Sequence, residues 1–295
     1  MYSEITSNKR QTVFLIVIFS VIILGLGYVF GMQTGDPGFG ILIATVVATV
    51  MNLFSYYQGD TIALKSSGAR LIEKRDSPEY FSLVENLCIA SGVPMPKLYI
   101  IEDSSPNAFA TGRDPEHASI AVTTGLLQQL EKAELEGVLA HELSHIKNYD
   151  IRVMMIVVVL VGIIALLADW TLRVVFGRHS DRAEGRAGAI LMIVGLVLAI
   201  LSPLIAELIK LAISRRREYL ADASGSLITR HPEGLARALE KIATIDRPLQ
   251  RKSHATAHLF LANPFDPHVA SKFQQLFSTH PPIEDRIKRL RSMGV

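Results

Sequence analysis

The chain has 295 residues, of which 49% are hydrophobic, with a mean hydropathy of +0.30 and a formal net charge of +2. This hydropathy is high for a purely soluble protein and indicates membrane segments, while the nearly balanced charge gives no reason to expect nucleic acid as the main partner. Cys88 is the single cysteine, which excludes an intramolecular disulfide bond and a cysteine-based zinc cluster.

Two long uncharged stretches open the chain, at residues 12–32 and 37–59. As a helix, each is long enough to cross a hydrocarbon core of about 30 Å. Because only residues 33–36 separate them, they are predicted to form a helical hairpin. The first stretch is longer than the core of a secretory signal, and no small-residue cleavage site follows it, so we interpret it as a retained anchor.

Residues 153–168 and 187–206 form a second hydrophobic pair. The later stretch is long enough to span a membrane, whereas the earlier one reaches only about 24 Å as a helix. Arg152 and Asp169 at its ends would have to snorkel, or the bilayer would have to thin locally. Two interpretations stay open: a second spanning hairpin, or a hydrophobic hairpin that is buried in protein or enters one leaflet.

The distribution of lysine and arginine predicts the orientation of the first hairpin. Basic residues precede residue 12 and follow residue 59, while the tip of the hairpin carries only Asp36. Both ends, and the polar region that follows, are therefore expected to face the cytoplasm. The second pair fits this rule less well, because the loop at residues 169–186 contains four arginines.

The polar parts of the chain together have the size of one ordinary domain. The elements expected there, in chain order, are a helix at 77–90 that Gly92 ends, a strand at 97–101, a loop or irregular edge at 107–112, a short strand at 119–123 and a helix from 133 through 145. Helices and strands that follow one another in this order predict the α+β class.

The sequence H-E-L-S-H at residues 141–145 is the most specific chemical motif in the chain. On a helix, His141 and His145 lie on one face about one turn apart, so both imidazoles can reach one Zn²⁺ at about 2.0–2.1 Å each. Glu142 projects beside that metal, where its carboxylate can take a proton from a water molecule. The motif predicts one zinc ion per chain, with Glu142 as the general base.

A catalytic zinc usually has three protein ligands, and no third histidine follows at a short spacing. The candidate is Glu218, in S-R-R-R-E-Y-L-A-D, with Asp222 one helical turn further on. Glu218 would complete a His-His-Glu set, and Asp222 could accept the outer N–H of a ligand histidine and so select its tautomer. On spacing alone, an ion pair between Glu218 and the preceding arginines remains the alternative.

The combination of H-E-L-S-H-I-K-N-Y-D, a hydrophobic pair and R-R-R-E-Y-L-A-D resembles the membrane-bound zinc metallopeptidases of the HtpX type, which are relatives of the CaaX prenyl protease. The resemblance covers nearly the whole chain, including P-N-A-F-A-T-G at 106–112, A-T-A-H-L-F at 255–260 and S-T-H-P-P-I-E-D-R-I at 278–287. It implies a zincin-like peptidase domain in which Glu218 is the third zinc ligand. It also implies that the substrates are misfolded or damaged membrane proteins, cleaved on the cytoplasmic side of a bacterial inner membrane during a stress response.

The expected organisation has four parts. They are an N-terminal transmembrane hairpin at 1–62, the first part of the zinc peptidase domain at 63–150, an inserted hydrophobic hairpin at 151–210, either spanning or membrane-embedded, and the second part of the peptidase domain at 211–295.

Four further residues have a candidate role. His280, before two prolines, is expected either to donate to the developing oxyanion of the reaction or to form a structural turn. Arg286 is expected to orient that loop or to hold a carboxylate. Asn148 and Asp150 are interpreted as features of a helix end and of the membrane boundary.

His254 and His258 are also four residues apart, but no acidic residue accompanies them, so a second metal site is not expected. His258 is considered for the wall of the substrate cleft. Asn107 and the strand at 119–123 are considered for pairing with an extended substrate backbone, as edge strands commonly do.

The sequence therefore predicts an integral-membrane zinc endopeptidase whose partners are protein substrates and the lipid bilayer, with no nucleic acid; its oligomeric state is not determined. A non-catalytic membrane scaffold with a structural zinc is a second class, although such a site needs no base like Glu142. A transporter or channel is a third class, but the hydrophobic stretches contain no charged residues at mid-depth, where ion pathways usually have them.

Overall fold

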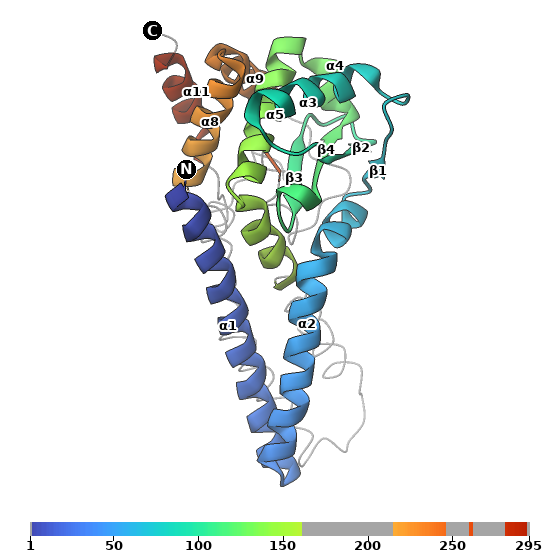
Figure 1. Cartoon of the computed structure of the whole chain (residues 1–295), viewed down its shortest axis with the longest axis vertical. Helices are drawn as coiled ribbons and strands as arrows, with labels where there is room; N and C mark the ends of the chain where they lie inside the picture. The colour runs from blue at the N-terminus through green and yellow to red at the C-terminus, as the bar shows by residue number, and fades with distance from the viewer. Residues whose placement is uncertain (1, 161–214, 246–259, 262–280, 294–295) are drawn as a thin grey trace.

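Two long helices, α1 (Tyr2–Thr34) and α2 (Pro37–Ser66), run side by side away from the rest of the molecule (Figure 1). The computed structural model describes residues 2–160, 215–245, 260–261 and 281–293. Asp36 caps α2 by accepting a hydrogen bond from the Phe39 N–H at 3.0 Å, with Pro37 in the first turn. Near the tip, a Cβ on Gly27 or Gly40 would clash with the facing helix, so the glycines allow the two helices to touch. The predicted helical hairpin is confirmed.

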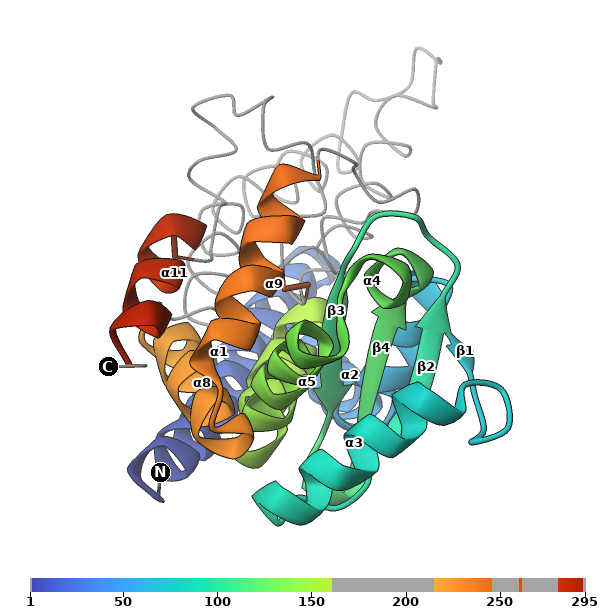
Figure 2. The ribbon, with the colours of Figure 1, turned by 90° about the horizontal axis from the view of Figure 1, so that it is seen from above.

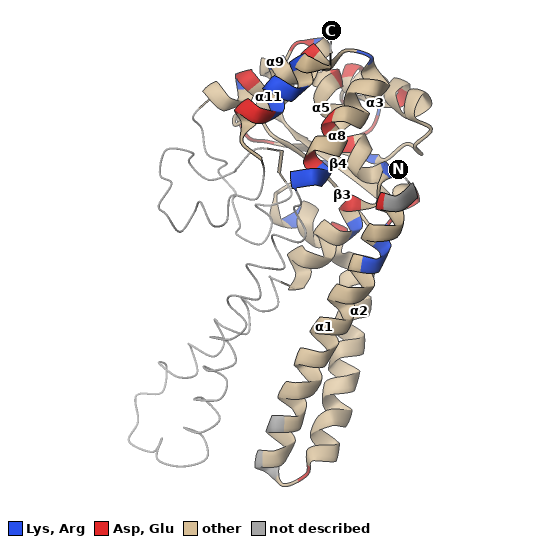
Figure 3. Cartoon of the chain, turned by 90° about the vertical axis from the view of Figure 1, so that its left-hand side faces the viewer, with Lys and Arg blue, Asp and Glu red and all other residues tan. Residues whose placement is uncertain are grey.

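The outer surface of this hairpin is apolar. Both helices are long and apolar enough to cross a membrane, and only 18% and 22% of their most hydrophobic windows are buried. Side chains such as Val17, Val21, Val46 and Leu53 are exposed. In Figure 3, where charged residues are coloured on the ribbon, most of them lie at the other end of the molecule, around the sheet and the shorter helices, and the tip of the hairpin is acidic. A water-soluble protein would bury such a surface, whereas lipid solvates it.

Residues 150–160 are helical and lie against the hairpin. Side chains including Val153, Ile156 and Leu160 are buried in a cluster with Leu15 and Phe19 of α1. The beginning of the second hydrophobic pair is thus covered by the first hairpin. The rest of that pair, including residues 187–206, lies outside the described residues.

A four-stranded sheet has the order β1-β2-β4-β3. Its strands are β1 (Arg70–Leu71), β2 (Lys97–Ile101), β3 (Ala108–Gly112) and β4 (Ala118–Thr123). Strands β2 and β4 are parallel, and the two other pairings are antiparallel. The strands predicted at 97–101 and 119–123 are confirmed.

Two expectations about this sheet are wrong. Residues 108–112 are not a loop or an irregular edge, because they form β3, which pairs regularly with β4 along its whole length. The alanines and the glycine of A-F-A-T-G have little strand propensity, and pairing with β4 together with complete burial decides the conformation of the segment. The strand at 119–123 is not an edge, because β2 and β3 occupy both of its sides.

Six helices of four or more residues complete the described part. They are α3 (Pro78–Ser91), α4 (Thr124–Gln129), α5 (Lys132–Lys147), α8 (Arg215–Thr229), α9 (Pro232–Thr244) and α11 (Ile283–Ser292). The predicted helix at 77–90 corresponds to α3, which has a proline in its first turn and ends at Gly92 with a φ of 68°. Figure 2 shows α5 between the sheet on one side and α8 and α9 on the other.

Helix α5 is the central element of this arrangement. Glu131 and Glu134 form a capping box at its start, and the buried Glu134 also binds Lys241 of α9 at 2.7 Å. Gly225 of α8 faces the backbone of His141, where a Cβ would lie only 3.0 Å from the His141 nitrogen. This close approach brings α8 against the face of α5 that carries the H-E-x-x-H motif.

Candidate metal centre and active site

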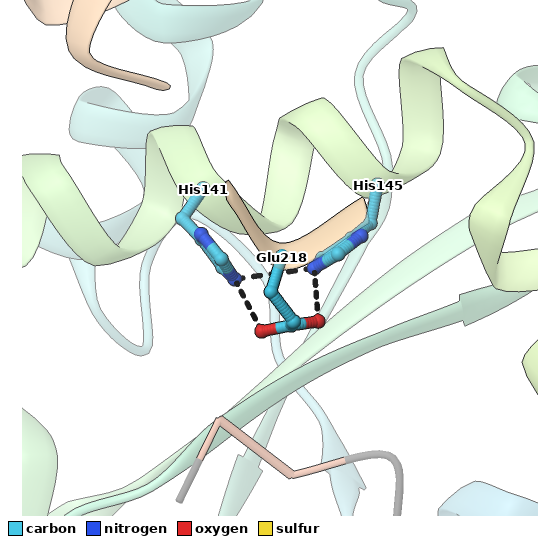
Figure 4. A group of neighbouring side chains, drawn as sticks. All are labelled: His141, His145 and Glu218. Carbon is cyan, nitrogen blue, oxygen red and sulfur yellow. Dashed lines mark hydrogen bonds and ion pairs between the residues drawn. The ribbon is translucent and has the colours of Figure 1, made fainter. Parts of the chain in front are cut away.

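His141 and His145 of α5 and Glu218 of α8 point toward one another and are all buried (Figure 4). The two Nε2 atoms are 3.1 Å apart. The carboxylate oxygens of Glu218 lie 3.8 Å from the His141 Nε2 and 3.5 Å from the His145 Nε2. Glu218, 73 positions beyond His145 in the sequence, thus joins the two histidines of α5, and one ligand atom of each residue lies within 4.8 Å of the others.

These separations fit a tetrahedral zinc ion. Ligand atoms at about 2.0–2.1 Å from a tetrahedral centre lie about 3.3–3.4 Å from one another. The two Nε2 atoms are 3.1 Å apart, and each lies close to that value from one of the two Glu218 oxygens, at 3.5 Å from Oε1 for His145 and 3.8 Å from Oε2 for His141. Two imidazoles and a carboxylate are also the donor types that zinc takes in peptidases.

The outer nitrogen of His141 is held from the C-terminal part of the chain. Its Nδ1 lies 2.9 Å from the Oδ1 of Asp222 on α8, as the spacing in the sequence predicted. Arg286 of α11 donates to both oxygens of Asp222, at 2.9 and 2.7 Å, and its guanidinium is fully buried. Arg286 therefore holds a carboxylate, one of the two roles expected for it. Although burial opposes the effect, Arg286 and the His141 hydrogen bond lower the pKa of Asp222.

The outer nitrogen of His145 is held by Asp150. The distance from Nδ1 to Oδ2 is 2.9 Å, and Asp150 is buried. The interpretation of Asp150 as a helix-end and boundary feature is incomplete, because it missed this contact. A two-residue turn with a left-handed φ of 62° at Tyr149 separates α5 from the helix at 150–160, and Asp150 directly after it contacts His145. An acidic residue shortly after an H-E-x-x-H helix was the available signal.

Each carboxylate selects the tautomer of its histidine. A neutral imidazole that donates from Nδ1 keeps its lone pair on Nε2, which is the atom turned toward the common point. Both ligand histidines are therefore supported in the way that metal-bound histidines usually are.

The buried charges around the two histidines have a negative excess. Four carboxylates and two guanidinium groups lie there among the described residues: Glu142, Asp150, Glu218, Asp222, Arg217 and Arg286. Once all four carboxylates are ionised, the excess of two negative charges matches the charge of Zn²⁺. Burying uncompensated charge is costly, so this set of residues fits a bound dication.

Glu142 lies beside the three candidate ligands and is buried. Burial raises the pKa of Glu142 to about 7, with the neighbouring His145 acting in the opposite direction and Glu218 adding to the rise. The backbone N–H of Ala110 on β3 donates to its carboxylate. A carboxyl group with a pKa near neutrality can both accept and return a proton, as a general base requires.

The same residues line a small pocket, whose remaining walls are Ala110 of β3, Met154 and Leu261. Met154 belongs to the helix that packs on the hairpin of α1 and α2, and Leu261 donates its N–H to the Ala108 carbonyl of β3 at 3.0 Å. The pocket is therefore bounded by the outer strand of the sheet and by the start of the second hydrophobic pair.

Several predicted residues play no part in this pocket as described. His280, His254 and His258 lie outside the described residues. The backbone of Asn107 pairs with Thr123, since the Thr123 N–H donates to the Asn107 carbonyl at 3.0 Å. Asn148 ends α5.

Comparisons with known proteins agree with this geometry. Residues 74–294 match the family described as Peptidase family M48. Three relatives carry the name Protease HtpX homolog. The protein from Dictyoglomus thermophilum is 46% identical, and the match covers 99% of this chain and 95% of that protein. For Thermoanaerobacter pseudethanolicus the identity is 47% over 99% and 98% of the two chains, and for Tropheryma whipplei it is 46% over 100% and 99%. The crystal structure of S. mikatae Ste24p is similar in fold, with a TM-score of 0.52 at 18% identity, covering 98% of this chain and 67% of that one.

Proposed function

The chain belongs to peptidase family M48 and is a membrane metalloprotease, and from that premise we propose that it is a zinc endopeptidase of the bacterial inner membrane. It cleaves misfolded or damaged membrane proteins at the cytoplasmic face, as part of a stress response. The observation that carries the proposal is the convergence of His141, His145 and Glu218 beside the buried Glu142.

His141, His145 and Glu218 would hold the zinc ion. When bound, zinc supplies a Lewis acid that polarises the scissile carbonyl and lowers the pKa of water. Asp222 and Asp150 keep the two imidazoles in the tautomer that offers Nε2.

Glu142 takes the proton from the attacking water and delivers it to the leaving amine. Its burial keeps the proton affinity high enough for the first step, and the Ala110 N–H keeps its carboxylate oriented. His280 is proposed as a donor to the oxyanion of the tetrahedral intermediate. It precedes the loop that leads to Arg286.

The backbone of β3 is the proposed docking edge for the substrate. The Thr123 N–H donates to the Asn107 carbonyl, so along β3 the backbone groups of Ala108 and Ala110 point away from β4. The Ala108 carbonyl already accepts from the Leu261 N–H, and the Ala110 N–H donates to Glu142. A substrate strand added along this edge would therefore take the place of Leu261 and pass directly beside Glu142, next to Ala110 of the pocket.

The position of the pocket supports access to membrane substrates. Lys9 of α1 lies 4.5 Å from the centre of the Tyr149 ring, and Arg152 lies 4.9 Å from Tyr149 and 5.7 Å from Tyr56 of α2. Cations and tyrosines in such a row are typical of the headgroup level of a membrane. Asp150, which holds His145, lies between Tyr149 and Arg152 in the sequence.

The test compares wild-type protein with Glu142→Gln, both in detergent, for zinc content and for cleavage of an unfolded test protein. We expect about one zinc per chain in both, and a loss of cleavage of about 10²–10⁴-fold in the variant, because the ligands remain and the base is gone. Glu136→Gln is the matched control, since it makes the same chemical change on the same helix outside the pocket.

Equal cleavage by wild type and Glu142→Gln would overturn the assignment of the base. A wild-type protein that holds zinc and cuts nothing would favour the non-catalytic scaffold. A loss of activity in Glu136→Gln of the same size would show that the assay reports folding and not chemistry.

A further inference from the structure

Asn8, on the membrane helix α1, is buried at the outer side of the metal centre. Its side-chain Nδ2 donates to the Oδ1 of Asp150 at 2.6 Å and to the carbonyl of Asn148 at 2.9 Å. Its Oδ1 accepts a hydrogen bond from Arg217 at 3.0 Å. The three groups that its side-chain amide contacts lie close in the chain to candidate metal ligands or bind one: Asp150 binds His145, Arg217 precedes Glu218, and Asn148 ends the helix that carries both histidines.

The partners of Asn8 determine how its amide is oriented. With the amide reversed, its oxygen would face the Asp150 carboxylate and the Asn148 carbonyl, and its NH₂ group would face a guanidinium that has no lone pair. The observed orientation uses both N–H donors and the oxygen. Both oxygens of Asp150 are engaged as well, one by His145 and one by Asn8.

The length of α1 explains why a membrane helix reaches this place. The uncharged stretch begins at residue 12, so the preceding ten residues of α1 extend about 15 Å beyond the hydrocarbon core. Figures 1 and 2 show this end of α1 beside α8. On the exposed side of this contact between α1 and α8, Glu4 and Arg216 form an ion pair at 3.2 Å.

We propose that Asn8 is a positioning residue for the metal centre, acting through Asp150 on His145. The membrane helix α1 then completes the hydrogen-bonded support of one metal ligand, in addition to anchoring the chain. This inference rests on the proposed role of His145 as a zinc ligand. If Asn8 has this role, the affinity for metal depends on how α1 packs against the peptidase part.

If Asn8 had a merely structural role, its substitution would change the stability of the fold and leave the zinc affinity unchanged. A role through Asp150 affects the orientation and basicity of the His145 imidazole, which the metal reports directly. Loss of a support of this kind typically weakens metal binding by about 10–100-fold, and Asn8 lies one step further out, so we expect about tenfold.

The experiment uses the full-length chain in detergent and the variants Asn8→Ala and Asn8→Leu. The leucine variant keeps nearly the volume of the side chain without its hydrogen bonds. Zinc affinity is measured by competition with a chelator, and the Co²⁺-loaded protein is examined by visible absorption. All titrations are made well below the unfolding temperature of the metal-free variant. Thr12→Val is the matched control, because Thr12 is a buried polar residue one turn along α1 whose hydroxyl bonds only to the Asn8 carbonyl among the described residues.

We expect both Asn8 variants to bind zinc about tenfold more weakly and to change the Co²⁺ spectrum, and Thr12→Val to match wild type in both measurements. An unchanged affinity and spectrum in Asn8→Leu would overturn the inference. So would equal losses in Asn8→Leu and Thr12→Val, which would indicate a general effect of α1 packing.

His145→Ala separates this inference from the proposed function. If it loses zinc while the Asn8 variants retain wild-type affinity, the zinc site stands and the role of Asn8 is wrong. If His145→Ala binds zinc as tightly as wild type, the proposed metal site itself is wrong.

Discussion

The two candidate histidine ligands are supported from different parts of the molecule. His141 is held by Asp222, which Arg286 binds in turn, so its support comes from α8 and α11. His145 is held by Asp150, which receives its second hydrogen bond from Asn8 on α1. One half of the site thus depends on the peptidase part alone, and the other half depends also on the hairpin.

The two supports also differ in charge. Asp222 faces a fully buried guanidinium at 2.7 Å, whereas Asp150 faces a neutral amide and has Arg217 at 4.0 Å. Burial, together with Arg286 and the charge on His145, lowers the pKa of His141, against the hydrogen bond that His141 donates to Asp222. Burial acts the same way on His145, but Asp150, Glu218 and Glu142 outweigh it and raise its pKa to about 9. In the metal-free protein the proton therefore resides on His145, the histidine supported by the hairpin, and not on His141.

Removing the guanidinium of Arg286 is the strongest way to break the first support. We expect Arg286→Met to reduce the free energy of unfolding by about 3–5 kcal/mol, because it leaves a buried carboxylate without its cation. Chemical or thermal unfolding in detergent measures the loss. Arg291→Met, on the same helix but exposed and paired with Glu233 and Glu240, should change stability little. Similar losses in both variants would contradict the special role of Arg286.

Replacing each supporting carboxylate by its amide compares the two halves directly. Asp222→Asn and Asp150→Asn should each weaken zinc binding by about 10–100-fold in chelator competition. Only Asp222→Asn is expected to lower the unfolding temperature strongly, because it also removes the partner of Arg286. Equal drops in unfolding temperature would show that the two supports do not differ as described.

The pH dependence of zinc binding sharpens the electrostatic difference. Because the raised pKa of His145 keeps it protonated below about 9, zinc must displace that proton. Affinity should therefore rise about tenfold per pH unit from pH 7 to about pH 9 and then level off. In Asp150→Asn the plateau should begin at a lower pH, since one of the charges that raises the pKa is gone. An affinity independent of pH in this range would refute the assignment of the proton to His145.

Among these substitutions, a change at Tyr149, in the turn before Asp150, should alter the free energy of unfolding least. Tyr149 has a left-handed φ of 62°, which costs a side chain of this size about 1–2 kcal/mol, while its ring packs under Lys9 and Arg152. Tyr149→Asn relieves the strain and removes the ring contacts, so the free energy of unfolding should change by less than about 1 kcal/mol. A large loss of zinc affinity with unchanged stability would show that the ring itself positions Asp150.

Local patterns predicted much of the fold correctly. Uncharged stretches of sufficient length indicated α1 and α2, and Pro78 with Gly92 marked the ends of α3. The failures were at β3, whose two alanines and glycine weaken the strand signal of Phe109 and Thr111, and at β4, whose place inside the sheet depends on β3. Strand order is set by pairing between segments, which a single strand's sequence does not encode.

The candidate site was predictable to different degrees. The i,i+4 spacing of His141 and His145 places them on one face of any helix, so their proximity followed from the motif. Glu218 lies 73 residues further along, and only a resemblance to a known family singled it out from an ordinary surface ion pair. The sequence places Asp150 at a helix end but does not predict its contact with His145, because no residue preference marks the left-handed turn at Tyr149 that precedes it.

The sequence alone determined the chemical groups of this protein: a two-histidine motif with its glutamate, an acidic candidate on a later helix, and a hydrophobic hairpin next to basic residues. The tertiary structure decided which groups support which, including the contact between Asn8 and Asp150, 142 positions apart. The physical reason is that helix periodicity and hydropathy act over a few neighbouring residues. The partner of a buried polar group, in contrast, is decided by the packing of distant segments that excludes water.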